Sequence, residues 1–429
     1  MNNRSINLAE FKQSWRVLLL SVLGIAVSIN AVLLYGFGTL VVPFEDTFGW
    51  SRSAQQVAIS FLYGGAVVGL QAVGWLNKRF GIQRVTVISL LLMAVGYLAC
   101  TQLIGGSIWT LYLMFAVLPI IGMGALAVTW TQLINLWFVE NRGLALAIGL
   151  SGTGITAVVA PNMMAWSIEQ YSWQAPFVLL ACLNLLLIPL SLLWFRLPQE
   201  ARPATISPQQ ADASILAVQG ISYRDGIGAP KFWICNLALG LVVSAVVGIV
   251  TNTIPILRDA GFAMSEAAFI FSFFGLSLIT GRLIVGYLLD RLWPPGVAAC
   301  SLVLPAIGCM IFLSGADSFI WLVAAVVLFG LGAGAEFDIA AFLVARYFGL
   351  ADYGRLFGFH QGLITVASSL APLMFAAMYL QSQNYQLLLY YCLAATLLGP
   401  LLLLSLGRPP DFSADPVTPQ GQSRAMQRQ

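Results

Sequence analysis

Long apolar runs separated by short polar segments recur along the whole chain. A membrane-spanning helix needs about 20 mostly apolar residues, and twelve runs approach or exceed that length. They cover residues 16–42, 54–76, 85–103, 108–138, 144–168, 174–195, 232–255, 265–289, 297–313, 319–345, 357–379 and 385–406. The pattern predicts an all-α membrane protein with twelve transmembrane helices.

One long polar stretch, rich in Pro, Ser, Gln and Ala, divides these runs into six and six. A stretch of this composition is typical of a linker between two folded units. We therefore expect a short N-terminal segment, a six-helix bundle, a linker, a second six-helix bundle and a tail. Their expected limits are 1–15, 16–196, 197–231, 232–406 and 407–429.

The composition excludes several classes of protein. The chain is 59% hydrophobic and 9% charged, whereas a soluble domain carries about 25% charged residues. A net charge of +3 without a basic tract argues against nucleic-acid binding. The six cysteines all lie in apolar runs, where we interpret them as packing residues. No pattern for a metal or cofactor is present, and the first apolar run is too long for a cleaved signal.

The basic residues predict an orientation in the membrane. With twelve spans, 17 of the 20 Lys and Arg residues fall on the side that holds both termini, and two, Arg52 and Arg258, fall on the other. Basic residues concentrate on the cytoplasmic side of membrane proteins. We therefore expect both termini in the cytoplasm and the protein in the cell (inner) membrane. A missed or invented span would destroy this bias.

The two halves of the sequence resemble each other. Residues 47–81 align with residues 259–293 at a constant offset of 212, without gaps. The matches include the pairs Gly69/Gly281 and Gly74/Gly286 as well as the prolines at 43 and 255. Six spans per half is an even number, so both halves have the same orientation in the membrane. Such parallel repeats are typical of transporters that work by alternating access around a site near the midplane.

Two loops carry a motif that resembles the signature of the major facilitator superfamily. The first is GWLNKRFG at residues 74–81, and its counterpart is GYLLDR at residues 286–291. In the first loop Lys78 stands where the family usually has Asp. The resemblance implies that these loops help to hold the two halves in the outward-open state. The motif residues are Gly74, Arg79, Gly81, Gly286, Asp290 and Arg291.

Within the superfamily, the chain is similar to the monocarboxylate and oxalate–formate porter branch. The similarity rests on FGWSRS before the second span, RGLALAIGLSGTGITAVVAP in the fifth, and an arginine in the eighth. It implies that this arginine, Arg282, binds an anionic substrate. The monocarboxylate transporters carry an Asp one turn earlier, where this chain has Leu278, so their proton-coupling pair is absent in its usual form.

Ionisable side chains inside the spans are the first candidates for function, because burying a charge in the bilayer costs several kcal/mol. Arg282 lies about 12 Å along its helix from Asp290, and its planar fork matches a carboxylate. Glu336 and Asp338 are predicted to serve proton coupling, but they point about 200° apart around one helix. The structural alternative is an ion pair between Arg282 and one of them. His360 is a further candidate, although a lone buried histidine is more often a packing residue.

Uncharged polar residues complete the candidate site. The resemblance implies that the first, fourth, seventh and tenth helices line the central cavity. Such residues can equally form hydrogen bonds to neighbouring helices. The candidates on these helices are Asn30, Tyr35, Thr129, Gln132, Asn135 and Asn252.

These observations favour secondary transport of a small organic anion, a mono- or dicarboxylate, by a functional monomer with possible coupling to protons. An efflux or neutral-solute carrier of the same fold, with purely structural charges in its spans, is the first alternative. A membrane-bound enzyme or sensor is the second. The sequence contains no nucleotide-binding loop of the GxxxxGK[ST] type, no metal cluster and no catalytic triad spacing, which argues against that alternative and against drive by ATP.

Overall fold

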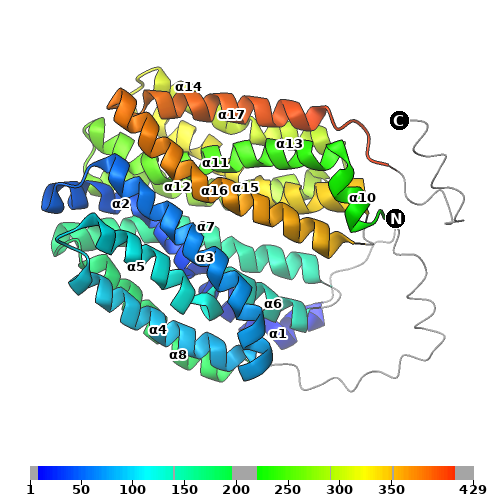
Figure 1. The fold of residues 1–429 in the computed structure, drawn as a ribbon, viewed down its shortest axis with the longest axis horizontal. Helices are drawn as coiled ribbons and strands as arrows, with labels where there is room; N and C mark the ends of the chain where they lie inside the picture. Colours follow the sequence, from blue (N-terminus) through cyan, green and yellow to red (C-terminus); the bar gives the residue numbers. More distant parts are fainter. Residues whose placement is uncertain (1–7, 139–140, 196–219, 290, 350–351, 411–429) are drawn as a thin grey trace, which may run out of the picture.

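The apolar runs fold into α-helices that lie roughly along the long axis of the molecule (Figure 1). The computed structural model describes residues 8–138, 141–195, 220–289, 291–349 and 352–410. Over these residues, 11 helical segments are long and apolar enough to cross a membrane. The fourth predicted span adds a pass made of shorter pieces. The predicted all-α membrane fold is confirmed.

The helices of the two halves form two layers, with the first half (blue to cyan) below the second (green to red) in Figure 1. The first half contains α1 (Leu8–Ala26), α2 (Ile29–Phe48), α3 (Arg52–Phe80), α4 (Ile82–Leu103), α5 (Ile108–Ile121), the 3-10 turn η1 (Met123–Ala125), α6 (Ala127–Trp137), α7 (Arg142–Gln170) and α8 (Ala175–Trp194). The second half contains α10 (Tyr223–Gly228), α11 (Pro230–Asp259), α12 (Met264–Leu289), α13 (Pro294–Leu302), α14 (Leu304–Leu313), α15 (Phe319–Phe348), α16 (Tyr353–Ser382) and α17 (Gln386–Leu404).

Three of the predicted spans are broken helices. The first divides between α1 and α2, where Ser28 has an extended backbone. The fourth divides at Gly122, and Leu126 is extended between η1 and α6. The ninth divides before Pro305, which lies in the first turn of α14, the place in a helix where the missing N–H of proline costs least. The seventh and tenth spans, α11 and α15, are continuous helices of 30 residues each.

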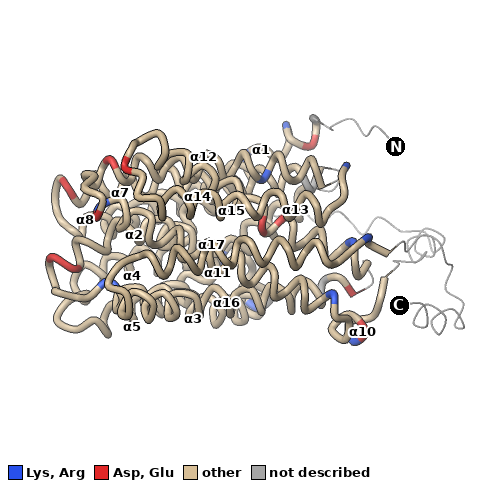
Figure 2. Tube along the Cα trace, turned by 90° about the horizontal axis from the view of Figure 1, so that it is seen from above, with Lys and Arg blue, Asp and Glu red and all other residues tan. Residues whose placement is uncertain are grey.

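The described chain begins and ends at the same end of the molecule, at the start of α1 and the end of α17 (Figure 1). We call this the terminal end and the opposite one the far end. Lys and Arg residues gather mainly at the terminal end, while the middle of the molecule carries few charges (Figure 2). This distribution is what the predicted topology requires. Most of the predicted linker and tail, and the first seven residues, lie outside the described residues.

The two halves contact each other along three helix pairs, α7 with α12, α3 with α16, and α2 with α11. Between described residues, every hydrogen bond, ion pair and ring contact that joins the halves lies in the middle of the molecule or toward the far end. On α7 and α12, the backbones meet at Gly154 and Gly275: a Cβ added at Gly275 would lie 2.5 Å from the carbonyl oxygen of Gly154, and one added at Gly154 would lie 3.0 Å from that of Gly275. The halves are therefore joined in the middle and at the far end.

Within the second half, α12 and α15 are packed backbone to backbone. A Cβ added at Gly334 would lie 2.1 Å from the carbonyl oxygen of Leu278, and one added at Gly281 would lie 2.4 Å from that of Leu331. Small residues allow membrane helices to approach this closely, and the gain is dense packing. The contact fixes the rotation of the two helices that carry the charged candidates.

Replacing Gly334 with alanine tests this contact. The new methyl group would press on backbone, which cannot move aside as a side chain can, so we expect a loss of about 1–3 kcal/mol. The measurement is the melting temperature of the purified protein in detergent. Gly362 on α16, whose added Cβ meets nothing within 4 Å, provides the matched Gly→Ala control. Equal melting temperatures for the two variants would contradict the close approach of α12 and α15.

Candidate functional site

Arg282 is held inside the second half, between α12 and the middle of α15. Its side chain is only 8% exposed, and its Nε lies 3.3 Å from Oδ2 of Asp338. That separation exceeds the roughly 2.7–2.9 Å of a strong charge-assisted hydrogen bond. Its Nη1 is buried without a hydrogen-bond partner among the described residues. Asp338 therefore balances the charge of the guanidinium, while Nη1 remains able to donate a further hydrogen bond.

Asp338 is more open than its partner, with 32% of its side chain exposed. It lies well inside a 30-residue helix that crosses the membrane. A carboxylate at such a depth normally faces the interior of the bundle or a water-filled space, because contact with lipid would cost several kcal/mol. We infer that Asp338 faces the polar interior, and that it forms the open side of the Arg282 pair.

Glu336 forms no ion pair with Arg282, although the guanidinium lies within electrostatic reach of its carboxyl group. Its side chain is buried, and its Oε2 has no hydrogen-bond partner among the described residues. Two tyrosines of the first half, Tyr35 on α2 and Tyr63 on α3, lie within electrostatic reach of Glu336. Tyr35 is also within reach of Arg282, and its ring lies 5.9 Å from that of Phe274 on α12. Groups from both halves thus interact with one another around Glu336.

The remaining uncharged candidates lie on separate elements. Asn30, in the first turn of α2, has a buried Oδ1 without a hydrogen-bond partner among the described residues. On α6, Gln132 and Asn135 are exposed, while Thr129 is buried, with a hydroxyl that no described residue bonds. No contact among the described residues joins any of these four side chains to Arg282.

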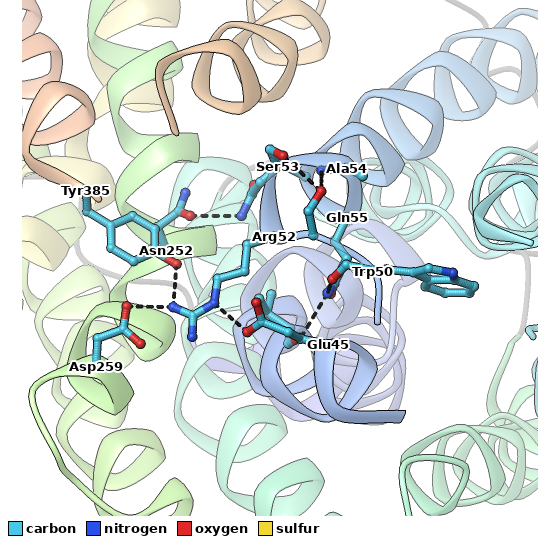
Figure 3. Close-up of polar contacts among 12 residues, drawn as sticks. Glu45, Trp50, Arg52, Ser53, Ala54, Gln55, Asn252, Asp259 and Tyr385 are labelled. Atoms are coloured by element: carbon cyan, nitrogen blue, oxygen red, sulfur yellow. Dashed lines mark hydrogen bonds and ion pairs between the residues drawn. The ribbon is translucent and has the colours of Figure 1, made fainter. Parts of the chain in front are cut away.

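Asn252 and His360 make their contacts elsewhere. Asn252 on α11 accepts a hydrogen bond of 2.9 Å from Nε2 of Gln56 on α3, so it joins the two halves in this conformation (Figure 3). His360 is fully buried on α16, where its Nδ1 lies 2.8 Å from Oδ1 of Asn236. The amide nitrogen of Asn236 is already used in a bond to Phe232, so the histidine Nδ1 donates and Oδ1 accepts.

A second cluster of charges lies at the far end, around Arg52 at the start of α3 (Figure 3). Its Nε donates to Oε2 of Glu45 at 2.8 Å. Its Nη1 donates to Oδ2 of Asp259 at 2.6 Å and to the hydroxyl of Tyr385 at 3.3 Å. Burial raises the pKa of the Tyr385 hydroxyl, so this partner stays neutral at physiological pH. One guanidinium therefore binds three groups from both halves.

Comparison with known proteins identifies the family to which this architecture belongs. The profile of the Major Facilitator Superfamily matches residues 23–372, which is most of the chain. The chain belongs to the major facilitator superfamily. It is accordingly a multi-pass transporter.

The chain is similar to two relatives in the superfamily and to one solved structure. Monocarboxylate transporter 13 of Bos taurus is 24% identical over 413 residues, which cover 95% of this chain and 92% of the relative. The gallate transporter of Pseudomonas putida is 25% identical over 308 residues, which cover 64% of this chain and 66% of the relative. The crystal structure of a D-xylose–proton symporter superposes with a TM-score of 0.70 at 14% identity, covering 94% of this chain and 99% of that one.

The loop motif of the superfamily has the same local structure in both halves. Arg79 lies over the ring of Trp75, with its guanidinium carbon 5.3 Å from the ring centroid, and Arg291 lies 3.9 Å over Tyr287. These four residues correspond at the repeat offset of 212. Gly81 has a positive φ of 84° between α3 and α4, a conformation that favours glycine. Gly74 and Gly286 have open space where a Cβ would be, and Asp290 lies outside the described residues.

Sequence reasoning missed Tyr63, Gln56 and the partners of Arg52. Tyr63 and Gln56 are single polar residues in an apolar span, and their spacing alone does not show which helix they face. Arg52 entered only as one of the two basic residues on the far side. A signal was available, because Arg52 and Asp259 both lie beside the far ends of spans that carry Pro43 and Pro255, the matched prolines of the repeat.

Replacing Asp338 with asparagine tests whether the ion pair with Arg282 supports the fold. The change removes the ion-pair partner of a buried guanidinium, which costs about 3–5 kcal/mol in fully buried pairs. We expect a smaller loss here because Asp338 is partly open, measured as a lower melting temperature in detergent. Glu336→Gln, on the same helix but outside the pair, is the matched control.

A double substitution separates structure from function. Arg282→Met with Asp338→Leu removes both charges and keeps apolar volume, so we expect the melting temperature to recover toward that of the unmodified protein. An unchanged melting temperature in Asp338→Asn would show that Asp338 is not needed to hold Arg282.

Proposed function

We propose that this chain is a secondary active transporter of a small organic anion, a mono- or dicarboxylate, that works by alternating access. The observation that carries the proposal is the buried Arg282 guanidinium with an unused donor, within electrostatic reach of a tyrosine of the other half. A carboxylate would find there the bidentate partner that its geometry matches. The names of two relatives support this class, since gallate and monocarboxylates are organic anions.

The same proposal assigns roles to the neighbouring groups. Asp338 is the resident counter-ion of Arg282, and an arriving carboxylate takes over part of that role. Glu336, buried and outside the ion pair, carries the coupled proton. Tyr35, with Asn30 and Gln132 from the first half, completes the cavity, and Asn252 and His360 contact substrate in another conformation of the cycle. The motif residues Gly74, Arg79, Gly81, Gly286 and Arg291 act in the change of state.

The proposed setting is the cell (inner) membrane with both termini in the cytoplasm. The bundles are residues 16–196 and 232–406, joined by a cytoplasmic linker over 197–231, and the protein acts as a monomer. The parallel repeat supports this division, because two similar bundles can rock against each other around a site at the midplane. The terminal end of the molecule then faces the cytoplasm.

Substitution of Arg282 tests the anion site directly. In reconstituted vesicles we expect Arg282→Ala to lower carboxylate uptake about 100-fold or more, and Arg282→Lys to retain part of it, because lysine offers charge without the planar fork. The exposed Arg408, beyond the end of α17, provides a matched Arg→Ala control that should leave uptake unchanged. Normal uptake of the true substrate by Arg282→Ala would remove this residue from the site.

Glu336 provides a test of proton coupling. Glu336→Gln mimics the protonated acid and cannot release a proton, so we expect it to exchange substrate across the membrane but to lose accumulation driven by a pH gradient. The measurement is uptake into vesicles with and without an imposed pH gradient, followed by counterflow. Accumulation that responds to the gradient as before would contradict the role of Glu336.

A carrier of a neutral solute, or an efflux carrier, is the second candidate. The observation that favours it is the ion pair itself, because Asp338 already neutralises Arg282, and the D-xylose–proton symporter shows that this fold also serves a neutral substrate. Competition decides between the two. Simple carboxylates should inhibit transport by an anion carrier and should leave a neutral-solute carrier unaffected.

A further inference from the structure

The Arg52 cluster contains one contact within the first half and two between the halves. Glu45 is near the end of α2 and Arg52 begins α3, so their ion pair stays within the first half. Asp259 ends α11 and Tyr385 precedes α17, so the other two partners belong to the second half. Glu45 therefore holds the guanidinium in place while Asp259 and Tyr385 bind it from across the interface (Figure 3).

A second cross-link lies one helical turn below the first. Gln56 follows Arg52 by four residues on α3, and its Nε2 donates to Asn252 on α11. Residues four apart face the same side of a helix, so both links leave α3 in the same direction. Nearby, a Cβ added at Gly38 on α2 would lie 3.1 Å from Ile254 on α11. The far ends of α2, α3 and α11 are thus closed around this ladder of contacts.

The cross-half bonds determine what an opening motion at the far end has to break. Any motion that opens the far end must therefore break the bonds of Arg52 to Asp259 and Tyr385. It need not break the bond to Glu45, which moves with the first half.

We propose that Arg52 is a latch at the far end. Its bonds to Asp259 and Tyr385 hold the two halves together there, and Glu45 positions its guanidinium. The latch holds the transporter closed at the far end in the absence of substrate. Arginine suits this task because its fork offers several donors in fixed directions, whereas a lysine at the same place would offer one point charge. This inference concerns the conformational balance and does not rest on the identity of the substrate.

The test measures the distance between the two halves in the substrate-free protein. Spin labels on Gln102→Cys and Ser318→Cys, two exposed positions at the far ends of the two halves, report opening by double electron–electron resonance. The exposed native thiols, Cys182 and Cys300, are first replaced by alanine. We expect Asp259→Asn to raise the ratio of open to closed molecules about five-fold, within the range of partly exposed ion pairs.

Three further variants make the result specific. Tyr385→Phe removes the longer of the two cross-half bonds and should shift the ratio in the same direction by a smaller factor. Arg52→Lys should shift it nearly as far as Asp259→Asn. Asp46→Asn is the matched control, because it removes an exposed carboxylate near the end of the same helix as Glu45 that bonds to no described residue, and it should not increase opening.

Two outcomes would overturn the latch. One is a distance distribution in Asp259→Asn that equals that of the labelled parent. The other is an increase in Asp46→Asn as large as in Asp259→Asn, which would indicate a general electrostatic effect. Because no substrate is present, neither outcome bears on the proposed transport of organic anions, which stands or falls with Arg282.

Discussion

The constraint on which the rest of the structure depends is the placement of one guanidinium deep within a membrane protein. A cation in that environment must be paired or hydrated, because the surrounding lipid can do neither. Here the pairing depends on helix packing: Gly281 and Gly334 let α12 and α15 meet backbone to backbone, and this contact brings Asp338 within 3.3 Å of Arg282. Packing between apolar helices thus determines the electrostatics of the candidate site.

The pairing leaves the site incomplete, and that incompleteness is informative. An ion pair that served structure alone would be expected to saturate its donors, because each buried unpaired polar group costs about 1–3 kcal/mol. Arg282 keeps an unpaired Nη1 and Glu336 an unpaired Oε2. Tyrosines of the other half lie within electrostatic reach of these groups. These two unsatisfied groups therefore lie within reach of the first half, where a solute passing between the halves would meet them.

Much of the fold could be predicted from the sequence, because the bilayer imposes a length on every apolar run and a bias on every basic residue. Twelve passes and an all-helical fold follow from these two rules. The helix breaks at Ser28 and Leu126 do not, since the runs that contain them stay apolar throughout. The sequence also shows that Glu336 and Asp338 diverge, but not which of them meets Arg282. That choice depends on the rotation of α15, which the glycine contacts determine.

Cross-half contacts were the hardest feature to predict, for a related reason. Helical periodicity orders residues around one helix, whereas Arg52 and Asp259 are brought together by the relative position of two bundles. Asn252 shows the consequence: its place in a cavity-lining helix predicts contact with substrate, yet its carbonyl oxygen is used by Gln56 in this conformation. A polar residue on such a helix can bond to the other half in one state and contact the solute in another.

The site and the far-end contacts together suggest how binding could drive the cycle. A solute shifts a conformational equilibrium only by as much as it binds one state better than the other. Arg282, Asp338 and Glu336 belong to the second half, while Tyr35 and Tyr63 belong to the first, so a solute that touches both groups binds best when the halves close around it. Closure at the terminal end strains the contacts at the far end, where Asp259 is 44% exposed and its bond to Arg52 can be exchanged for bonds to water. The free energy of binding then needs to exceed only the modest cost of breaking those bonds, and not that of separating two apolar surfaces.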